Sequence, residues 1–340
     1  MSYITINKQN FFHNLDICSK RANCKENVAI VLKDNAYGHG LIEISSLAKE
    51  YGITKAVVQN IDEAKKIESY FEYILILADT KKESLSHSFH ITINTIDDID
   101  LLEENTNIHI KIDTGMHRNG IAPNELKSTI HKALKRNLNI TGVFTHFKSA
   151  DIMSSVYFYQ KSIFRDIKKS LSLICEQLNI SKIKLHSCNS SALFREENFS
   201  EDLCRIGIAA YGYIENEDPL YVPNLKPVLS LNTQKISSRT LKKGQTIGYG
   251  GNFIANEDMQ ISTYDIGYGD GFKRLSKNEY FQINKKERTL GNISMDNMSI
   301  NSTKDEICLF DDVKPLAKLH NTISYEILTS LSPSIKRVIV

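Results

Sequence analysis

A lysine stands at the end of an apolar run and directly before a glycine-rich turn. The run is Val28-Ala-Ile-Val-Leu32, and Lys33 is followed by Asp-Asn-Ala-Tyr37-Gly-His-Gly40. A lysine at the end of a buried strand is partly desolvated, which lowers the pKa of its amine and allows the free base to form a Schiff base with an aldehyde. Taken alone, a strand-end lysine more often extends its ammonium group to solvent, so this assignment needs support from the rest of the chain.

The string around Lys33 resembles the pyridoxal-phosphate (PLP) signature of alanine racemases, and further blocks of that family follow in order over about residues 3 to 330. The resemblance implies a PLP-dependent amino-acid racemase that interconverts L- and D-alanine and supplies D-alanine for a bacterial cell wall. The blocks are Lys111-Ile-Asp-Thr-Gly-Met-His-Arg118, Thr145-His146-Phe147, His186-Ser-Cys-Asn189-Ser190, Arg205-Ile-Gly207-Ile208, Gly248-Tyr249-Gly250, Ile266-Gly-Tyr268-Gly-Asp and Gly291-Asn-Ile-Ser-Met295-Asp296.

The resemblance assigns the cofactor contacts to the first two thirds of the chain. Lys33 would hold the aldehyde as a Schiff base, His146 would lie against the ring, and Arg205 would face the pyridine nitrogen. Because arginine donates a hydrogen bond but hardly a proton, the ring nitrogen stays neutral, which disfavours a long-lived carbanion and favours racemisation. The phosphate attracts hydroxyls and backbone N–H groups. The residues expected around it are Tyr37, Asn189, Ser190, Gly207 and Ile208.

Racemisation also needs one base on each face of the planar carbanion. Lys33 can serve one face, and Tyr249 resembles the second base of the family, which reaches the active site of the partner subunit. A free tyrosine titrates at about 10, so neighbouring positive charge or a hydrogen-bond chain must activate it. His146 and Arg205, with His186 behind them, are the candidates for that chain. The resemblance therefore implies a homodimer with shared active sites.

The carboxylate of the substrate requires a cation or hydrogen-bond donors. Arg118 resembles the arginine that contacts this carboxylate, and the backbone N–H of Met295 from the partner chain resembles a second contact. Tyr268 and Asp296 resemble residues of the entry channel. Lys111 occupies the position of a lysine that is carbamylated in some family members, and the sequence leaves its state open.

Two places depart from the family pattern. Pro333 stands where the family has a tyrosine that touches the phosphate, which leaves open what replaces that contact. Near the entry, Asn292 replaces a usual arginine and Ser294 a frequent cysteine. These changes leave open a broad-specificity amino-acid racemase as an alternative.

The elements that must hold these residues alternate along the first two thirds of the chain. Continuous apolar strands between helices indicate a parallel sheet, and about eight such units over ~200 residues favour a closed (β/α)8 TIM-type barrel, whose catalytic face lies at the strand ends. Strands are expected at 28–32, 56–59, 73–78, 91–93, 108–112, 140–147, 183–187 and 203–206, and helices at 41–51, 61–69, 97–104, 124–136 and 155–177.

The pattern changes near Pro223 and Pro227, after which strand-like segments lie between glycine and asparagine turns. Residues 228–233, 260–265 and 298–301 have strand character, and 323–331 has helical character. We expect a PLP-binding barrel over residues 7–225 and a smaller, mostly β domain over 226–340. The strand-like residues 3–6, within an N-terminal segment of about residues 1–6, are expected to join that second domain.

The composition argues against several function classes. The 340 residues carry a formal net charge of +2, so no strong field recruits nucleic acid or anionic lipid. No apolar run approaches a membrane span, and the first residues do not form a secretory signal. The six cysteines include no C-x-x-C pair, which argues against a zinc site and favours reduced thiols. We expect a cytoplasmic protein without metal, nucleic-acid or membrane partners.

Two rival functions share the cofactor. A PLP-dependent decarboxylase of the same architecture, acting on basic amino acids, would place an acidic residue rather than Arg205 at the ring nitrogen. A non-catalytic PLP-binding protein would lack both the β domain and Tyr249. The sequence favours the racemase over both.

Overall fold

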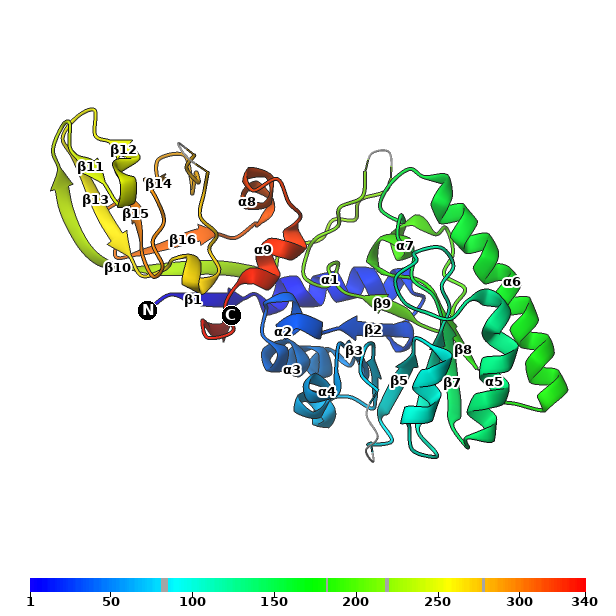
Figure 1. Cartoon of the computed structure of the whole chain (residues 1–340). Helices are drawn as coiled ribbons and strands as arrows, with labels where there is room; N and C mark the ends of the chain where they lie inside the picture. The colour runs from blue at the N-terminus through cyan, green and yellow to red at the C-terminus, as the bar shows by residue number, and fades with distance from the viewer. Residues whose placement is uncertain (81–84, 182, 218–219, 277–278) are drawn as a thin grey trace. The chain divides into compact units, whose positions relative to one another are not determined.

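The computed structural model describes residues 1–80, 85–181, 183–217, 220–276 and 279–340, which divide into two compact units (Figure 1). The barrel unit comprises Phe12–Asp34 and Ile44–Lys226. The β unit comprises Met1–Phe11, Asn35–Glu43 and Pro227–Val340. The chain therefore changes unit directly after the Lys33 segment, and the short stretch Asn35–Glu43 belongs to the β unit.

The described part of the barrel unit contains an eight-stranded parallel sheet in the order β8-β7-β6-β5-β4-β3-β2-β9. Backbone hydrogen bonds from Asp202 N to Leu185 O and from Arg205 N to Cys188 O, each 3.0 Å, join the two end strands and close the sheet. The predicted barrel is confirmed. Its strands are β2 Val28–Val31, β3 Lys55–Val58, β4 Tyr73–Ile76, β5 Phe89–Ile93, β6 Asn107–Lys111, β7 Asn139–Phe144, β8 Lys184–His186 and β9 Cys204–Ile206.

Helices cover the outside of this sheet, as Figure 1 shows for α4, α5 and α6. Most of them follow the predicted ranges, since their apolar residues recur at helical spacing and face the strands. The helices are α1 Lys8–Arg21, α3 Leu41–Tyr51, α4 Ile61–Ile67, α5 Leu126–Lys135, α6 Ser155–Leu178 and α7 Ser190–Arg195, with 3-10 turns at Lys25–Asn27, Glu68–Tyr70 and Pro123–Glu125.

Two predicted ranges of the barrel unit were wrong. The stretch 97–104 forms only the 3-10 helix η3, Ile96–Leu101, in which Ile99 is the one buried residue and Leu101 is exposed. Without an apolar stripe, the segment cannot hold a full α-helix against the barrel. Strand β7 ends at Phe144 rather than at 147, because the Thr145 hydroxyl donates to Ile112 O at 2.8 Å and the chain turns there.

The β unit is built around β10, Leu229–Leu241, a strand of 13 residues that pairs with β1, β13 and β16. Strand β1, Tyr3–Ile6, lies between β10 and β17, so the N-terminal strand belongs to the sheet of this unit. The short helix α8 was not predicted. The remaining elements are β11 Thr246–Ile247, β12 Phe253–Ile254, β13 Met259–Tyr264, β14 Thr289–Leu290, β15 Met298–Ile300, β16 Glu306–Phe310, α8 Lys314–Leu319, α9 Ser324–Ser330 and β17 Lys336–Ile339.

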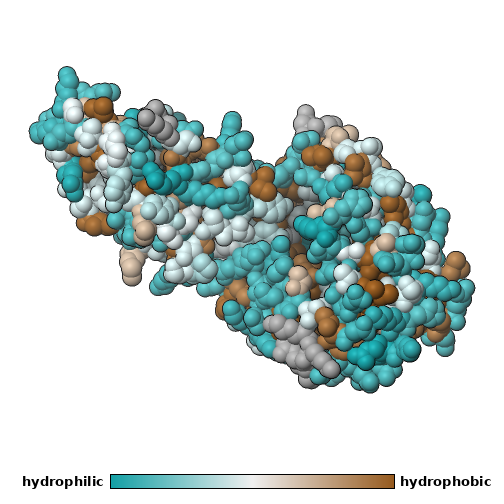
Figure 2. Space-filling model, viewed as in Figure 1, coloured by the Kyte–Doolittle hydropathy of each residue, from teal (hydrophilic) through white to brown (hydrophobic). Residues whose placement is uncertain are grey.

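Each unit has its own apolar core. Ile30, Val57 and Ile110 are fully buried in the barrel unit, and Ile4 and Leu231 in the β unit. On the face drawn in Figure 2, hydrophobic residues are dispersed among hydrophilic ones in both units. Among the helices that the structure describes, none combines the length and apolarity needed to span a bilayer.

Candidate active site

Lys33 opens a short left-handed turn directly after β2. In this element, α2 (Lys33–Tyr37), the four residues from Asp34 to Tyr37 have φ angles between 52° and 55°. A left-handed conformation costs an L-residue about 1–2 kcal/mol, so four in succession persist only where surrounding contacts hold them. Asn35 Oδ1 accepts from Leu41 N at 2.9 Å, and Arg337 donates to Gly38 O at 2.9 Å. The turn therefore sets the directions of both the Lys33 and the Tyr37 side chains.

The amine of Lys33 lies among other cationic groups of the barrel unit. The Lys33 side chain is 34% exposed, and its Nζ lies 3.7 Å from the Asp34 carboxylate. Burial, followed by the charges of Arg118, Arg205 and Lys33, lowers the pKa of Lys111 to about 8. The structure thus brings Lys33, Lys111, Arg118 and Arg205 together at one end of the barrel, an arrangement that favours an anionic ligand.

His146 belongs to the same cluster. Burial and the charges of Arg205, Lys111, Arg118 and Lys33 lower its pKa to about 3, so the imidazole is neutral. The residue lies in the loop after β7 and is half-buried. A neutral ring in this position can lie against a planar cofactor without adding a further charge to the cluster.

Arg205 is buried on β9 and anchored on two sides. Its NH1 lies 2.5 Å from His186 Nδ1, and its NH2 donates to Thr145 O at 2.8 Å. No described residue accepts from its Nε and no described carboxylate pairs with it, so one donor is available for a ligand. Burial lowers the pKa of Arg205, yet a guanidinium keeps its proton under all ordinary conditions. The acidic residue that the decarboxylase alternative requires is not at this position.

The predicted phosphate-side residues meet where α7 starts. Asn189 is the N-cap of α7: its Oδ1 accepts from Ala192 N at 2.9 Å, and its Nδ2 donates to Phe147 O at 3.1 Å. Ser190 Oγ accepts from Gly207 N at 3.2 Å and Ala209 N at 3.3 Å. Because those two bonds use its lone pairs, the Ser190 hydroxyl keeps its own proton for an acceptor such as phosphate.

Gln160 of α6 is a supporting residue that sequence reasoning missed. It is fully buried and donates to His146 O and to Thr114 Oγ1, each at 3.2 Å, while its carbonyl accepts from Lys148 N at 3.0 Å. One amide thereby connects the loops after β6 and β7. A lone glutamine within a long amphipathic helix gives no sequence signal for this role.

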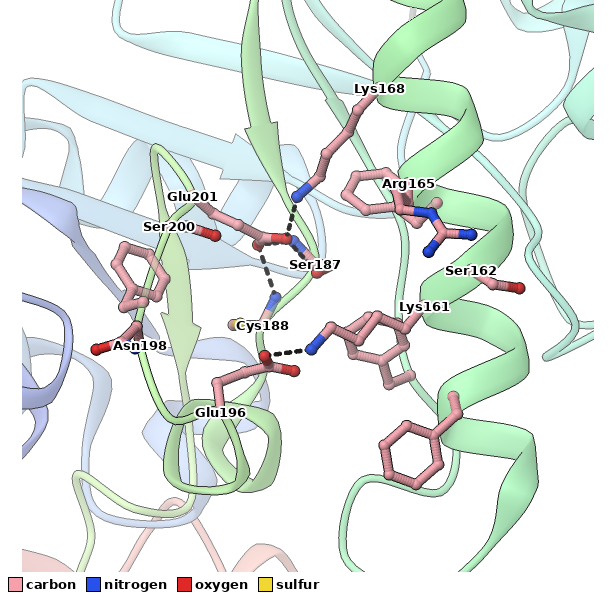
Figure 3. A pocket seen from close by; sticks show the side chains of 14 residues that line it. Lys161, Ser162, Arg165, Lys168, Ser187, Cys188, Glu196, Asn198, Ser200 and Glu201 are labelled. Carbon is pink, nitrogen blue, oxygen red and sulfur yellow. Dashed lines mark hydrogen bonds and ion pairs between the residues drawn. The ribbon is translucent and has the colours of Figure 1, made fainter.

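A cavity of about 470 Å³ lies between α6 and the segments beside β8 and β9 (Figure 3). It contains none of the predicted site residues. Glu201 crosses it, pairs with Lys168 at 3.0 Å and accepts from the backbone N–H groups of Ser187 and Cys188. Lys161 pairs with Glu196 at 2.5 Å in the same cavity. These ion pairs support the segment that leads into Asn189. We therefore assign the residues of this cavity a structural role.

Three further predicted residues, Tyr249, Tyr268 and Met295, belong to the β unit and are exposed. Tyr249 is 74% exposed on the turn η5, Tyr249–Gly251, and its carbonyl accepts from Asn292 Nδ2 at 2.7 Å. Tyr268 opens a second turn, η6 (Tyr268–Asp270), next to Met295: Gly269 N donates to Met295 O at 2.8 Å. The structure therefore brings Asn292 to Tyr249 and Tyr268 to Met295.

Tyr37 and the departure at Pro333 also fall within the β unit. Tyr37 is buried, with its ring centroid 5.9 Å from that of Tyr325. Arg337 donates to Pro333 O and to Gly38 O, each at 2.9 Å. The segment that lacks the family tyrosine is thus tied to the backbone directly after Tyr37.

Comparison with known proteins accounts for nearly the whole chain. The family model "Alanine racemase, N-terminal domain" matches residues 6–215, and "Alanine racemase, C-terminal domain" matches residues 228–339. The chain belongs to the alanine racemase family. Alanine racemases of a Nitratiruptor species and of Campylobacter concisus are 45% and 42% identical to it over 337 residues, with 99% of each chain covered.

Solved alanine racemases have the same fold. The enzyme of Clostridium difficile 630 superposes with a TM-score of 0.90 at 26% identity, and that of Bacillus anthracis, solved with bound L-Ala-P, with 0.87 at 26%. Both comparisons cover all of this chain and 95% of the other. The predicted family and enzyme class, an isomerase of a PLP-dependent family, are confirmed.

Proposed function

We propose that this protein interconverts L- and D-alanine with PLP bound at Lys33, and that Lys33 and Tyr249 of the partner subunit are the two bases. The observation that carries the proposal is the convergence of Lys33, Arg118, His146 and Arg205 in a chain of the alanine racemase family. Several cations in one partly buried place suit a doubly charged phosphate cofactor and a carboxylate substrate.

The residues present fit the cofactor. Lys33 would bind its aldehyde, Arg205 Nε would donate to its ring nitrogen, and His146 would lie against its ring. When bound, PLP withdraws electrons from the Cα atom of the amino acid and so acidifies the Cα hydrogen. The phosphate contacts that we propose are the Ser190 hydroxyl, the Tyr37 hydroxyl and the backbone of Asn189, Gly207 and Ile208.

The side chains then divide the remaining work. Arg118 would bind the substrate carboxylate, which fixes the two faces of Cα relative to the bases. Lys33 Nζ would hold or take a proton on one face and the hydroxyl of the partner's Tyr249 on the other. The guanidinium of Arg205 would leave the ring nitrogen without a proton, so that reprotonation of Cα is favoured over other outcomes.

The exposure of the β-unit residues supports a shared site. Tyr249, Met295 and Tyr268 are 74%, 57% and 42% exposed, although the family resemblance assigns all three to the reaction. We propose a homodimer in which each barrel receives these side chains from the other subunit. The D-alanine product would serve cell-wall synthesis, and a cytoplasmic location stays a prediction.

Chiral analysis tests the activity. Purified protein is incubated with L-alanine, L-serine or L-lysine, with and without added PLP, and both enantiomers are measured. We expect D-alanine to form fastest and only with PLP. Comparable D-serine or D-lysine would instead establish the broad-specificity racemase, which the Asn292 and Ser294 departures favour as the second candidate. An amine product would establish a decarboxylase.

Subunit mixing tests the shared site. Lys33→Ala and Tyr249→Phe chains are each expected to be inactive, and their heterodimer should recover activity because one of its two sites is intact. Tyr280→Phe, which changes another exposed tyrosine of the β unit, is the matched control and should keep full activity. Absence of rescue in a heterodimer verified by mass spectrometry would contradict the proposal.

A further inference from the structure

A polar layer crosses the barrel core, where apolar side chains otherwise predominate. Tyr73 of β4, His109 of β6 and His186 of β8 come from alternate strands, and all three are buried. Tyr73 Oη lies 2.8 Å from His109 Nε2, and His109 Nδ1 lies 2.9 Å from His186 Nε2. Such layers of barrels of this type usually consist of Val, Ile and Leu, and burying polar rings costs free energy, so this layer requires an explanation.

Arg205 fixes the direction of every hydrogen bond in the layer. Its NH1 lies 2.5 Å from His186 Nδ1, and because a guanidinium only donates, Nδ1 must accept. A neutral His186 then carries its proton on Nε2 and donates it to His109 Nδ1. His109 in turn carries its proton on Nε2 and donates it to the Tyr73 hydroxyl oxygen. Burial lowers the pKa of both histidines well below the ordinary value, which keeps both rings neutral.

The sequence of β7 keeps space for the His109 ring. A Cβ atom on Gly142 would lie 2.0 Å from both Cε1 and Nδ1 of His109, closer than any real contact. Gly142 is not among the residues with a left-handed φ, so it provides room rather than conformational freedom. The missing side chain at 142 and the ring at 109 are complementary features of one arrangement.

We propose that His109, supported by Tyr73 and accommodated by Gly142, is a positioning residue for the racemase reaction. This inference rests on the proposed function. His109 holds His186 in the Nε2–H tautomer, so that His186 Nδ1 accepts from Arg205 and orients the guanidinium toward the ring nitrogen of the cofactor. The opposite tautomer of His186 would present an N–H group to Arg205 and displace it.

Ring tautomers give a readout that is independent of activity. In the full chain with ¹⁵N-labelled histidine, with and without PLP, we expect ring ¹⁵N shifts of neutral Nε2–H tautomers for both His109 and His186 between pH 6 and pH 9. The signals are assigned with His109→Gln and His186→Gln variants. A proton on Nδ1 of either ring would overturn the proposal.

Paired substitutions at 109 separate positioning from packing. His109→Phe keeps a ring but loses both hydrogen bonds, and we expect kcat to fall ~10- to 100-fold, as for other supporting residues, with a changed visible absorbance of bound PLP and little change in KM. His109→Gln keeps an acceptor and a donor and should retain most of kcat. Equal losses in the two variants, or unchanged kcat and absorbance in His109→Phe, would contradict a positioning role.

His90→Phe is the matched control. The His90 ring packs on Tyr73 with centroids 4.1 Å apart, but its Nδ1 hydrogen bonds to Thr141 Oγ1, outside the chain of bonds to Arg205. The His90→Phe variant should therefore leave kcat and the visible absorbance of bound PLP unchanged. Should His109→Phe fail to fold, Gly142→Ala combined with His109→Ala restores the volume balance and should show the same loss of kcat.

Failure of the two proposals can be told apart. If the wild-type protein does not racemise alanine but both rings are Nε2–H, the proposed function fails and the hydrogen-bond order stands. If the protein racemises alanine while His186 carries its proton on Nδ1, the positioning role fails and the function stands.

Discussion

The site residues of the two units differ in how they are held. In the barrel unit, Arg205 and His186 are 5% and 0% exposed, and each makes hydrogen bonds within the sheet. In the β unit, Tyr249 is 74% exposed, and among the described residues the hydrogen bond to it, from Asn292 Nδ2, reaches its backbone carbonyl. The proposed site residues of the barrel unit are therefore preorganised within one chain. Those of the β unit are exposed, and their side-chain positions depend on what packs against them.

The difference also has an electrostatic side. The barrel unit concentrates Lys33, Lys111, Arg118 and Arg205, and an anionic ligand would reduce their mutual repulsion. The exposed residues of the β unit carry no such cost. Binding of PLP should therefore stabilise the barrel unit by mass action, and substitutions there should have the larger effects.

Removal of the Lys33 amine should have the largest effect. Lys33→Ala is expected to lower kcat/KM on the order of a thousandfold or more, since it removes both the proposed cofactor anchor and one proposed base. The measurement is D-alanine formation at saturating PLP. Lys55→Ala, at the start of strand β3, is the control and should keep activity in the folded fraction. Near-normal activity of Lys33→Ala would show that the cation cluster has another purpose.

Arg205→Lys should have the next largest effect. Lysine keeps the charge but cannot donate to His186, to Thr145 O and to a ligand in the fixed directions of a guanidinium. We expect kcat to fall ~100-fold or less, in the range found for supporting contacts, and the absorbance of bound PLP to shift. Arg136→Lys, whose arginine donates to Leu102 O on the outside of the barrel, should change neither quantity. An unaltered kcat in Arg205→Lys would show that the reaction requires only a positive charge at position 205, and not the hydrogen bonds of a guanidinium.

Much of the fold follows from local patterns, while the fine structure of the site does not. The apolar runs around Val28 and Tyr73 predict their strands, and the helix from Leu41 to Tyr51 has the bounds expected from its spacing. Family resemblance predicted the cofactor and substrate residues, and those roles stay predictions. No local signal predicts the left-handed turn from Asp34 to Tyr37, because contacts from distant residues such as Arg337 hold it.

The supporting residues were missed for the same reason. His109 is bonded to Tyr73 and His186, which are 36 and 77 residues away in the sequence. His109 precedes Lys111 by two residues, so both side chains lie on the same face of β6. This spacing was the one available sequence clue that His109 lies on the same side of the strand as a predicted site residue. Glu201 and Gln160 offered no comparable pattern.

Acid should destabilise the protein through its buried imidazoles. Burial lowers the pKa of His90 and His146 to about 3 and those of His109 and His186 well below 6.5. Such groups contribute stability above pH 6.5, which is lost as the pH falls toward 3, because the unfolded chain binds protons that the folded barrel cannot. Each imidazole should cost about 1 kcal/mol of unfolding free energy per pH unit below 6.5.

Urea unfolding followed by far-UV circular dichroism at pH 7.5, 6 and 5 measures this loss. The range lies above the ordinary pKa of carboxyl groups, so histidines dominate it. The urea midpoint should fall steadily as the pH is lowered. His90→Phe should make the unfolding free energy depend less steeply on pH, by the contribution of one protonating group. A midpoint that is constant from pH 7.5 to 5 would contradict the buried neutral imidazoles.

The smallest effect is expected at Asn292, whose side chain contacts the turn of Tyr249 in the β unit. Asn292 Nδ2 donates to Tyr249 O at 2.7 Å, and its Oδ1 accepts from Asn252 Nδ2 at 2.9 Å, so one amide braces the turn that carries the proposed second base. Each such bond contributes about 0.5–1.5 kcal/mol net. Asn292→Ala should therefore lower kcat about three- to tenfold. KM for alanine and PLP affinity should stay unchanged, because the substitution leaves the barrel unit intact.

Steady-state kinetics in both directions sharpen this result. If the partner's Tyr249 serves only one face of Cα, loosening its turn should alter the solvent isotope effect in one direction more than in the other. Asn284→Ala, which removes a side-chain bond to Glu287 elsewhere in the β unit, is the control and should leave both directions unchanged. A loss in Asn292→Ala that appears as weaker PLP binding would mean that the turn of Tyr249 also supports cofactor binding, and it would contradict a role of this turn in proton transfer alone.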